Sequence, residues 1–316
     1  EMKRPSPAQL DGLLVLHKPA GPTSTDCLNS IKRALGQKKI GHAGTLDPMA
    51  TGVLVVLLGQ GTKLAPYLSE GRKTYRGELL LGQTTDTYDI QGQILSEAPW
   101  EHLSADDIRA AVLGWQDETR QEVPPVSAAK HQGRPLYALH RAGREVPVKT
   151  RDMTIFGVEI LSMHLPRVSF RVICSAGTYI RSLAHSLGRR LGCGAALSEL
   201  EREASHPFTL DQAHGLETVL SDPERFASLV LPLAQSLPHW PRLRLTGQQA
   251  ELVRNGAWLP ASLLPAHPAE ADHVPRSGRR SPGAGRSEKT RSGPLLVHSA
   301  RLVASLSSCS QWLCRT

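Results

Sequence analysis

The chain has 316 residues, of which 40% are hydrophobic, and it carries a formal net charge of +8 with a pI of about 9.4. This length and apolar content suffice for two domains with a hydrophobic core. No apolar run approaches the about 18 residues of a membrane span, and no signal-peptide core follows the charged start, Glu1 to Pro7. These features exclude the membrane class and favour a cytoplasmic protein. The basic excess suits a polyanion, but nucleic acid, an anionic membrane surface and simple solubility explain it equally well.

The five cysteines indicate neither a disulfide framework nor a metal site. They form no Cys-x-x-Cys pair, and no histidines stand at zinc-ligand spacing from them. Cys174 lies in a strand-like alternation and Cys193 follows an expected helix end, so both are expected to be small core residues. The sequence predicts no metal and no organic cofactor. The five are Cys27, Cys174, Cys193, Cys309 and Cys314.

The first elements are a short strand and a helix. Leu13 to Leu16 is an apolar run that indicates a strand. Ser24 to Leu35 is predicted to be a helix that ends at Gly36, because glycine most readily takes the left-handed cap conformation.

A glycine-rich segment, residues 41–52, follows and holds one acid, Asp47, directly before Pro48. Its three glycines relax the steric limits on the backbone, and the proline restricts Asp47 to extended or turn geometry. The apolar strand expected at Val53 to Leu58 would fix where the carboxylate points. Asp-Pro is also a common turn or helix start, so from the local pattern alone Asp47 could be only a cap.

The middle of the chain mixes strands and helices. A strand is expected from Tyr75, with Gly77, Leu79 and Leu81 on the same face, and a capping-box pattern at Ser104–Asp107 places a helix start near Asp106. Tyr75 could stack on a nucleic-acid base or only pack.

The alternating segment Val168–Cys174 indicates a half-buried strand. A helix should follow over Ile180 to Leu191, capped by Thr178 and stopped by Gly192. Arg181 would lie in its first turn, beside the apolar stripe, and could be either a solvated surface residue or a cation that approaches Asp47 and keeps it ionised.

The composition changes beyond about residue 235. Residues 243–245, a helix at 248–255 ended by Gly256, and the segments 293–297 and 301–304 suggest a small β-rich module, and residues 305–316 make a poor strand. Residues 265–292 are rich in Pro, Gly, Ser and Arg, so this insertion is expected to be disordered or extended.

Five segments, in order, resemble the motifs of the TruB-type tRNA pseudouridine synthases. The glycine-rich stretch with Asp47 resembles the family's catalytic motif, and the other segments cover the region from about residue 11 to 235. The five are Leu16–Ser24, Gly41–Leu54, Lys73–Tyr75, Pro124–Lys130 and Gly177–Leu183. Any one alone is weak, but the ordered set is specific. No P-loop spacing and no Gly-x-Ser-x-Gly motif supports a nucleotide-dependent enzyme or a hydrolase instead.

The resemblance implies roles for individual residues. Asp47 would be the catalytic residue, Arg181 its partner, and Tyr75 the platform that stacks on the target uracil. Five more residues match substrate-side or RNA-side positions: His42, Leu200, Tyr179, Lys130 and Lys18. For Lys18 the favoured interpretation is that it anchors the loops around the pocket.

The resemblance also implies an α+β fold, with a mixed, largely antiparallel sheet and flanking helices. The expected order is a tail at residues 1–10, a catalytic domain at 11–235 and a small β-barrel-like, PUA-type RNA-binding domain at 236–316. Basic residues recur beside the proposed active-site segments, which favours a phosphate-binding surface.

The expected activity is isomerisation of the T-loop uridine at tRNA position 55, with the tRNA T-arm as partner, no obligatory protein partner, and a monomeric chain. The alternatives are a non-catalytic RNA-binding or tRNA-folding protein and a guide-RNA-dependent relative that needs further proteins.

Overall fold

The computed structural model describes residues 9–127, 129–136, 138, 142, 147–238, 240, 242–255 and 311–313. The chain divides into two compact units, Glu1–Pro232 and Leu233–Thr316. Within the described residues, no helix is both long and apolar enough to span a bilayer.

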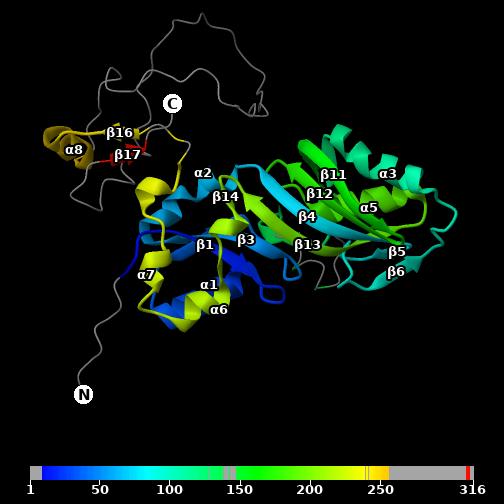
Figure 1. Cartoon of the computed structure of the whole chain (residues 1–316), viewed down its shortest axis with the longest axis horizontal. Coiled ribbons are helices and arrows are strands. Elements are labelled where there is room, and N and C mark those ends of the chain that lie inside the picture. The colour runs from blue at the N-terminus through cyan, green and yellow to red at the C-terminus, as the bar shows by residue number, and fades with distance from the viewer. Residues whose placement is uncertain are drawn as a thin grey trace, which may run out of the picture. The chain divides into compact units, whose positions relative to one another are not determined.

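One nine-stranded mixed sheet forms the centre of the first unit (Figure 1). Its main path runs β11-β12-β4-β13-β3-β1-β15, and the short strands β14 and β2 pair with β13 and β3. The β13–β3 and β1–β15 pairs are parallel, and the other pairs are antiparallel. The strands are β1 Gly12–Lys18, β2 Ile40–Ala43, β3 Thr51–Leu58, β4 Lys73–Leu81, β11 Ile155–His164, β12 Arg167–Cys174, β13 Ala195–Ser205, β14 Phe208–Thr209 and β15 His214–Gly215. The expected α+β class with a mixed sheet is confirmed.

Helices cover the sheet at both ends (Figure 1). Helix α5 (Ile180–Leu191) packs on β13, and α3 (Ala105–Leu113) packs on α5 and β11. At the other end α1 (Ser24–Leu35) contacts α6 (Leu216–Ser221), which also contacts β1. Their apolar faces close one hydrophobic core with the sheet, in which β3 is buried along almost its whole length.

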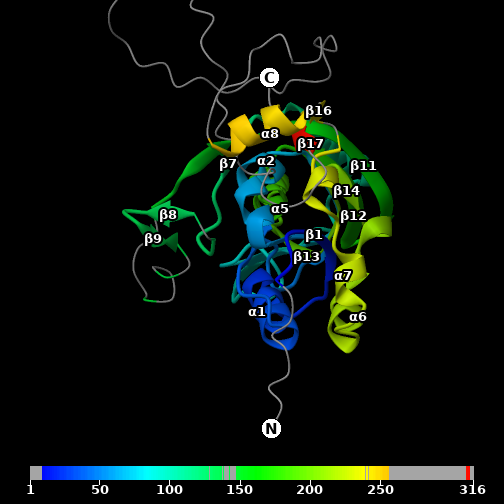
Figure 2. The ribbon, with the colours of Figure 1, turned by 90° about the vertical axis from the view of Figure 1, so that its left-hand side faces the viewer.

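Short elements fill the connections. Figure 2 shows the β8–β9 hairpin extending away from the sheet. The short connecting elements of this unit are η1 Gly59–Leu64, α2 Ala65–Ser69, β5 Gln83–Thr85, β6 Ile94–Glu97, η2 Gly114–Asp117, β7 Arg120–Glu122, β8 Lys130–His131, β9 Arg134–Pro135, β10 Thr150–Asp152, η3 Leu210–Gln212 and α7 Phe226–Leu229.

Most of the local signals are confirmed. Helix α1 has the predicted bounds and ends at Gly36, whose φ is 65°. Ser104 caps α3 through a capping box with Asp107. The predicted alternation is present along β12 and, from Tyr75 onward, along β4, where every second residue is buried.

The predicted cap of α5 is wrong. The residue at the N-cap is Tyr179, which makes no side-chain capping bond. Thr178 Oγ1 instead donates to Ser175 O at 2.9 Å, within the turn that precedes the helix. A threonine hydroxyl can bond either to the backbone of the preceding turn or to the first N–H groups of the helix, and here it bonds to the turn.

The second unit contains η4 (Leu233–Gln235), β16 (Arg242–Arg244), α8 (Gly247–Arg254) and β17 (Gln311–Leu313). Thr246 begins α8 with a capping box. β17 pairs antiparallel with β16, although the sequence around it was expected to be a poor strand. The predicted insertion at 265–292 and the segments 293–297 and 301–304 lie outside the described residues.

Candidate active site

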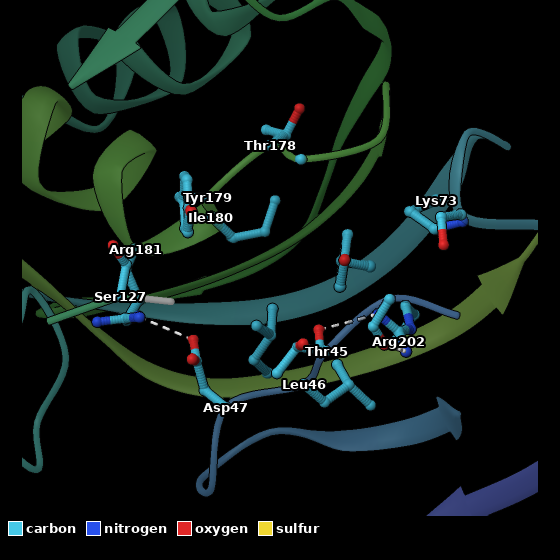
Figure 3. A pocket seen from close by; sticks show the side chains of 15 residues that line it. Thr45, Leu46, Asp47, Lys73, Ser127, Thr178, Tyr179, Ile180, Arg181 and Arg202 are labelled. Carbon is cyan, nitrogen blue, oxygen red and sulfur yellow. Dashed lines mark hydrogen bonds and ion pairs between the residues drawn. The ribbon is translucent and has the colours of Figure 1, made fainter. Parts of the chain in front are cut away.

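A cavity of about 220 Å³ opens where the loop after β2, strands β4 and β13 and the start of α5 meet (Figure 3). This is below the range of about 300–1,000 Å³ for drug-sized ligand sites, so it suits a group as small as one nucleobase. It is lined by Gly44, Thr45, Leu46, Asp47, Ser69, Lys73, Tyr75, Ser127, Gly177, Thr178, Tyr179, Ile180, Arg181, Leu200 and Arg202.

Asp47 lies on a loop that is held in place by the buried side chain of Lys18. Lys18 is fully buried, and its Nζ donates to Pro19 O, Pro48 O and Ala50 O at 2.8, 3.2 and 2.7 Å. Burial lowers the pKa of the Lys18 ammonium. These contacts support the anchoring interpretation of Lys18, because a side chain with no exposed surface cannot contact an RNA.

Two further contacts fix the loop at its ends. Ser24, at the start of α1, exchanges hydrogen bonds with the backbone of Leu46. Gly52 has a φ of +101°, and a Cβ there would lie 2.3 Å from Arg202 O. Only glycine allows the two strands to approach this closely.

Arg181 orients the Asp47 carboxylate. Its Nε donates to Asp47 Oδ2 at 2.9 Å, so the expected contact between these residues is present (Figure 3). Its Nη1 and Nη2 donate to Thr87 O and Val126 O at 2.8 and 3.0 Å. The side chain is only 4% exposed, which excludes the solvated surface alternative. A guanidinium bonded on three sides is a rigid support for a carboxylate.

A second carboxylate lies beside the same guanidinium. Asp89 Oδ2 is 3.6 Å from Arg181 Nε. Burial raises the pKa of Asp89, although Arg181 and the bonds from Thr87 and Gln91 oppose this shift. Asp89 was not predicted from the sequence, because its contact with Arg181 joins segments far apart in the chain.

Part of the cavity lining is apolar and aromatic. Tyr75 and Leu200 come from neighbouring strands, and Tyr179 and Ile180 from the start of α5. Burial raises the pKa of the Tyr75 phenol, so it is protonated at neutral pH. Such walls can hold a flat heterocycle by stacking and apolar contact.

Two buried cations stand at the end of the cavity away from Asp47 (Figure 3). Arg202 donates to Val53 O and Gly44 O at 2.7 and 2.9 Å, and to Thr45 O at 3.4 Å. Burial, and then the nearby Arg202 charge, lower the pKa of Lys73 to about 7. Arg202 was not predicted, but it shares an alternating register with Leu200 and Ala204, and an arginine in a buried register is a usable signal.

Besides Lys18, two predicted residues, His42 and Lys130, lie outside the lining of this cavity. His42 is in β2, where burial and then Arg202 lower the pKa of its ring, and its Nδ1 has no hydrogen-bond partner among the described residues. Lys130 lies in β8, and its side chain is outside the described part of the structure. Cys174 and Cys193 are buried in the core, as predicted. Within the described ranges, no three His, Cys, Asp or Glu residues cluster as metal ligands would.

The family model "TruB family pseudouridylate synthase (N terminal domain)" matches residues 32–180. A "tRNA pseudouridine synthase B" of Nitratidesulfovibrio vulgaris (strain Miyazaki F) is 59% identical over 255 residues, which cover 80% of this chain and 82% of that protein. Its namesake in Oleidesulfovibrio alaskensis is 58% identical over 269 residues, 85% of each chain. A third, from Geobacter sulfurreducens, is 46% identical over 249 residues, 78% of this chain and 82% of the relative.

Comparison with solved structures shows the same fold. The Cbf5–Nop10–Gar1 complex contains a chain with 29% identity and a TM-score of 0.61, over 79% of this chain and 68% of that one. The archaeal box H/ACA sRNP Nop10–Cbf5 complex gives 28% identity and a TM-score of 0.57, over 78% and 68%. The fold and the cavity therefore define a pseudouridine synthase, an isomerase. The chain belongs to the TruB family of pseudouridylate synthases, which confirms the resemblance found in the sequence.

Proposed function

We propose that this protein converts the T-loop uridine at tRNA position 55 to pseudouridine, and that Asp47 is its catalytic carboxylate. The relatives reported above are named tRNA pseudouridine synthase B, and this chain matches them over most of their length. This similarity supports tRNA as the substrate. The observation that carries the proposal for Asp47 is the 2.9 Å bond from Arg181, inside a cavity whose lining includes aromatic and apolar side chains.

The reaction breaks the bond between uracil N1 and ribose C1′, turns the base and joins C5 to C1′. The proton on C5 is then lost and N1 regains one, so the change is an isomerisation that needs no redox cofactor and no energy source. Asp47 acts either as nucleophile toward the sugar or as the base that takes a ribose proton. In both roles the bond from Arg181 Nε holds the carboxylate in a fixed orientation.

The detached uracil must stay in place while it turns. Tyr75 and Leu200 lie on adjacent strands and offer an aromatic ring and an aliphatic side chain to a flat base. A base reaches this enclosed site only after leaving its stack, at a cost of a few kcal/mol that is lowest in a loop. This cost favours a tRNA loop over a duplex as substrate.

The test uses purified protein and an unmodified tRNA transcript, with pseudouridine mapped by carbodiimide-blocked primer extension. Wild-type protein should produce a stop at position 55, and Asp47→Asn should abolish it while retaining tRNA binding. Asp117→Asn, at an exposed site in η2, is the matched control and should keep full activity. Wild-type protein that binds tRNA without producing pseudouridine would instead favour a non-catalytic RNA-binding role.

We also propose that the chain acts as a cytoplasmic monomer without an obligatory protein partner. The structural relatives were solved in complexes with Nop10 and Gar1, so dependence on partners is the specific alternative. Activity of the purified chain on bare tRNA would exclude that alternative.

The C-terminal residues 236–316 are proposed to form a PUA-type RNA-binding module. The β16–β17 pairing and the capped helix α8 support a folded β-containing unit there. Removal of residues 236–316 should weaken tRNA binding and leave the single-turnover rate at saturating enzyme largely intact.

A further inference from the structure

The segment 87–89, which supports the Arg181 guanidinium, has a strained backbone. Thr87 O accepts the 2.8 Å bond from Arg181 Nη1, and Asp89 Oδ2 lies 3.6 Å from Arg181 Nε. Tyr88, the residue between them, has a φ of +67°. A bulky side chain rarely adopts this left-handed conformation, because its Cβ then crowds the backbone. Strain of this kind persists only where surrounding contacts hold it, so the structure around Tyr88 must supply them.

One contact that holds Tyr88 is a ring stack with His185. The two ring centroids are 3.8 Å apart, and the ring planes differ by 10°. His185 lies on α5, one turn beyond Arg181. Burial and then the Arg189 charge lower the pKa of His185, against an opposing effect of Glu122, so the ring is neutral above pH 7. The stack therefore joins an uncharged ring on the helix to the phenol ring of the strained residue.

Backbone hydrogen bonds attach the same segment to the central sheet. Leu197 N, in β13, donates to Tyr88 O at 3.0 Å, and Ile90 N donates to Leu197 O at 3.0 Å. These bonds fix the segment on the side of the sheet, and the ring stack adds a link to α5, the helix that carries Arg181. The Tyr88 ring therefore connects the acceptor, Thr87 O, to the helix of its donor.

We propose that Tyr88 and His185 are a positioning pair, whose stack holds segment 87–89 against Arg181 and so fixes the guanidinium that orients Asp47. This inference rests on the proposed function, since it gives the orientation of Asp47 a role in catalysis. Neither ring lines the active-site cavity, and both line a second cavity of about 210 Å³. We therefore expect the pair to act on the reaction through Arg181, without touching the RNA or the reacting atoms.

The backbone strain makes the two members of the pair unequal. Without the His185 ring, Tyr88 keeps its disfavoured φ with less to hold it, so the segment should relax and withdraw Thr87 O from Arg181. Without the Tyr88 ring, the outcome depends on the replacement. Asparagine adopts a left-handed φ far more readily than tyrosine, so Tyr88→Asn should leave the segment in place despite the lost stack. Loss of the His185 ring should therefore be harmful, and Tyr88→Asn should rescue it.

The experiment compares single-turnover rates of pseudouridine formation at saturating enzyme with the tRNA affinities of the same proteins. His185→Gln removes the ring but keeps a polar side chain that suits a helix. It is compared with Tyr88→Asn, with the double variant, and with Tyr88→Phe, which keeps the ring. Val219→Ala is the control for lost stability, because it truncates a buried side chain in α6, at the other end of the sheet. Hydrogen exchange of residues 85–91 reports on the segment without requiring turnover.

The proposal expects His185→Gln to lower the rate about tenfold, less than the about 10²-fold cost of a 1 Å error, because Arg181 keeps its other acceptors. The double variant should be at least about threefold faster than His185→Gln, since the strain is released. Tyr88→Phe and Val219→Ala should stay within about twofold of wild type, as should tRNA affinity in every variant. Hydrogen exchange of residues 85–91 should be faster in His185→Gln and return toward wild type in the double variant.

Two results would overturn the positioning role: a His185→Gln rate within about twofold of wild type, or a double variant no faster than His185→Gln. A loss of tRNA affinity equal to the loss of rate would also overturn it, because the rings would then contact the RNA. Wild-type protein that forms no pseudouridine would contradict the proposed function instead. In that case the exchange data still decide whether the stack holds segment 87–89, so the two failures are distinguishable.

Discussion

Replacement of Arg181 by lysine tests how much of the activity depends on aiming one carboxylate. The wild-type guanidinium makes three bonds, to Asp47 Oδ2, Thr87 O and Val126 O, at 2.9, 2.8 and 3.0 Å. A lysine ammonium keeps the charge but cannot reproduce this planar fork. We expect it to satisfy one of the three acceptors and to leave the carboxylate free to shift.

The size of the effect follows from these contacts. A misplacement of about 1 Å in a reacting group costs about 10²-fold in rate. Two lost bonds from a charged donor, at about 1.5–3 kcal/mol each, would lower the free energy of unfolding by about 3–6 kcal/mol before relaxation. We therefore expect a rate loss of about 10²- to 10³-fold for Arg181→Lys, and a larger loss for Arg181→Met, which also removes the charge beside Asp47.

The assay is release of tritium from uracil C5 of labelled tRNA under single-turnover conditions, because that hydrogen leaves only when C5 joins the sugar. Arg189→Lys is the control, since Arg189 is on the same helix, is 63% exposed and has its bridging contact with Glu122 at 3.4 Å. It should stay within about twofold of wild type. A folded Arg181→Lys protein within about threefold of wild type would refute the claim that this guanidinium aims the carboxylate.

Three stability predictions follow from other parts of the structure, each measured by denaturant unfolding. Ser104→Ala removes the cap of α3 and should cost about 1 kcal/mol. Gly52→Ala should cost about 2–4 kcal/mol, because its positive φ and the 2.3 Å approach of the Arg202 carbonyl leave no room for a Cβ, whereas Gly41→Ala, with only an ordinary contact at 3.7 Å, should cost less than about 1 kcal/mol. For Lys73 the pKa is about 7 in the folded chain against an ordinary 10.5, so the unfolded chain binds more protons between these values. The free energy of unfolding should rise with pH there by up to about 1.4 kcal/mol per unit, and Lys73→Met should remove that rise.

The elements that sequence reasoning located are those whose signals are local. The capping box at Ser104 and the glycine after Leu35 fix helix ends through atoms within a few residues, so they can be recognised without a fold. The alternation in β12 likewise reports a sheet with one buried face. The prediction that Thr178 caps α5 was wrong, because its hydroxyl donates to Ser175 O in the turn before the helix.

The site was predictable only where a family motif marked it. Asp47 and Arg181 are 134 positions apart in the chain, and composition or periodicity does not pair residues at such a separation. Asp89, Lys73 and Arg202 went unassigned as site residues because their roles come from which strands lie side by side. Their charges acquire meaning only in a buried cavity, where the lack of solvent makes each unpaired group costly.

The three bonds from Lys18, to Pro48 and Ala50 in the Asp47 loop and to Pro19 in the adjoining segment, have a consequence for how the protein and the RNA adapt to each other. A loop that is hydrogen-bonded to the buried Lys18 ammonium has little freedom to change its conformation when a nucleoside binds. Under the proposed function the adjustment must therefore come from the tRNA, which has to open its T-arm locally to present the uridine. Turnover should consequently be faster on tRNAs whose T-arm opens easily than on those in which tertiary pairing holds it closed.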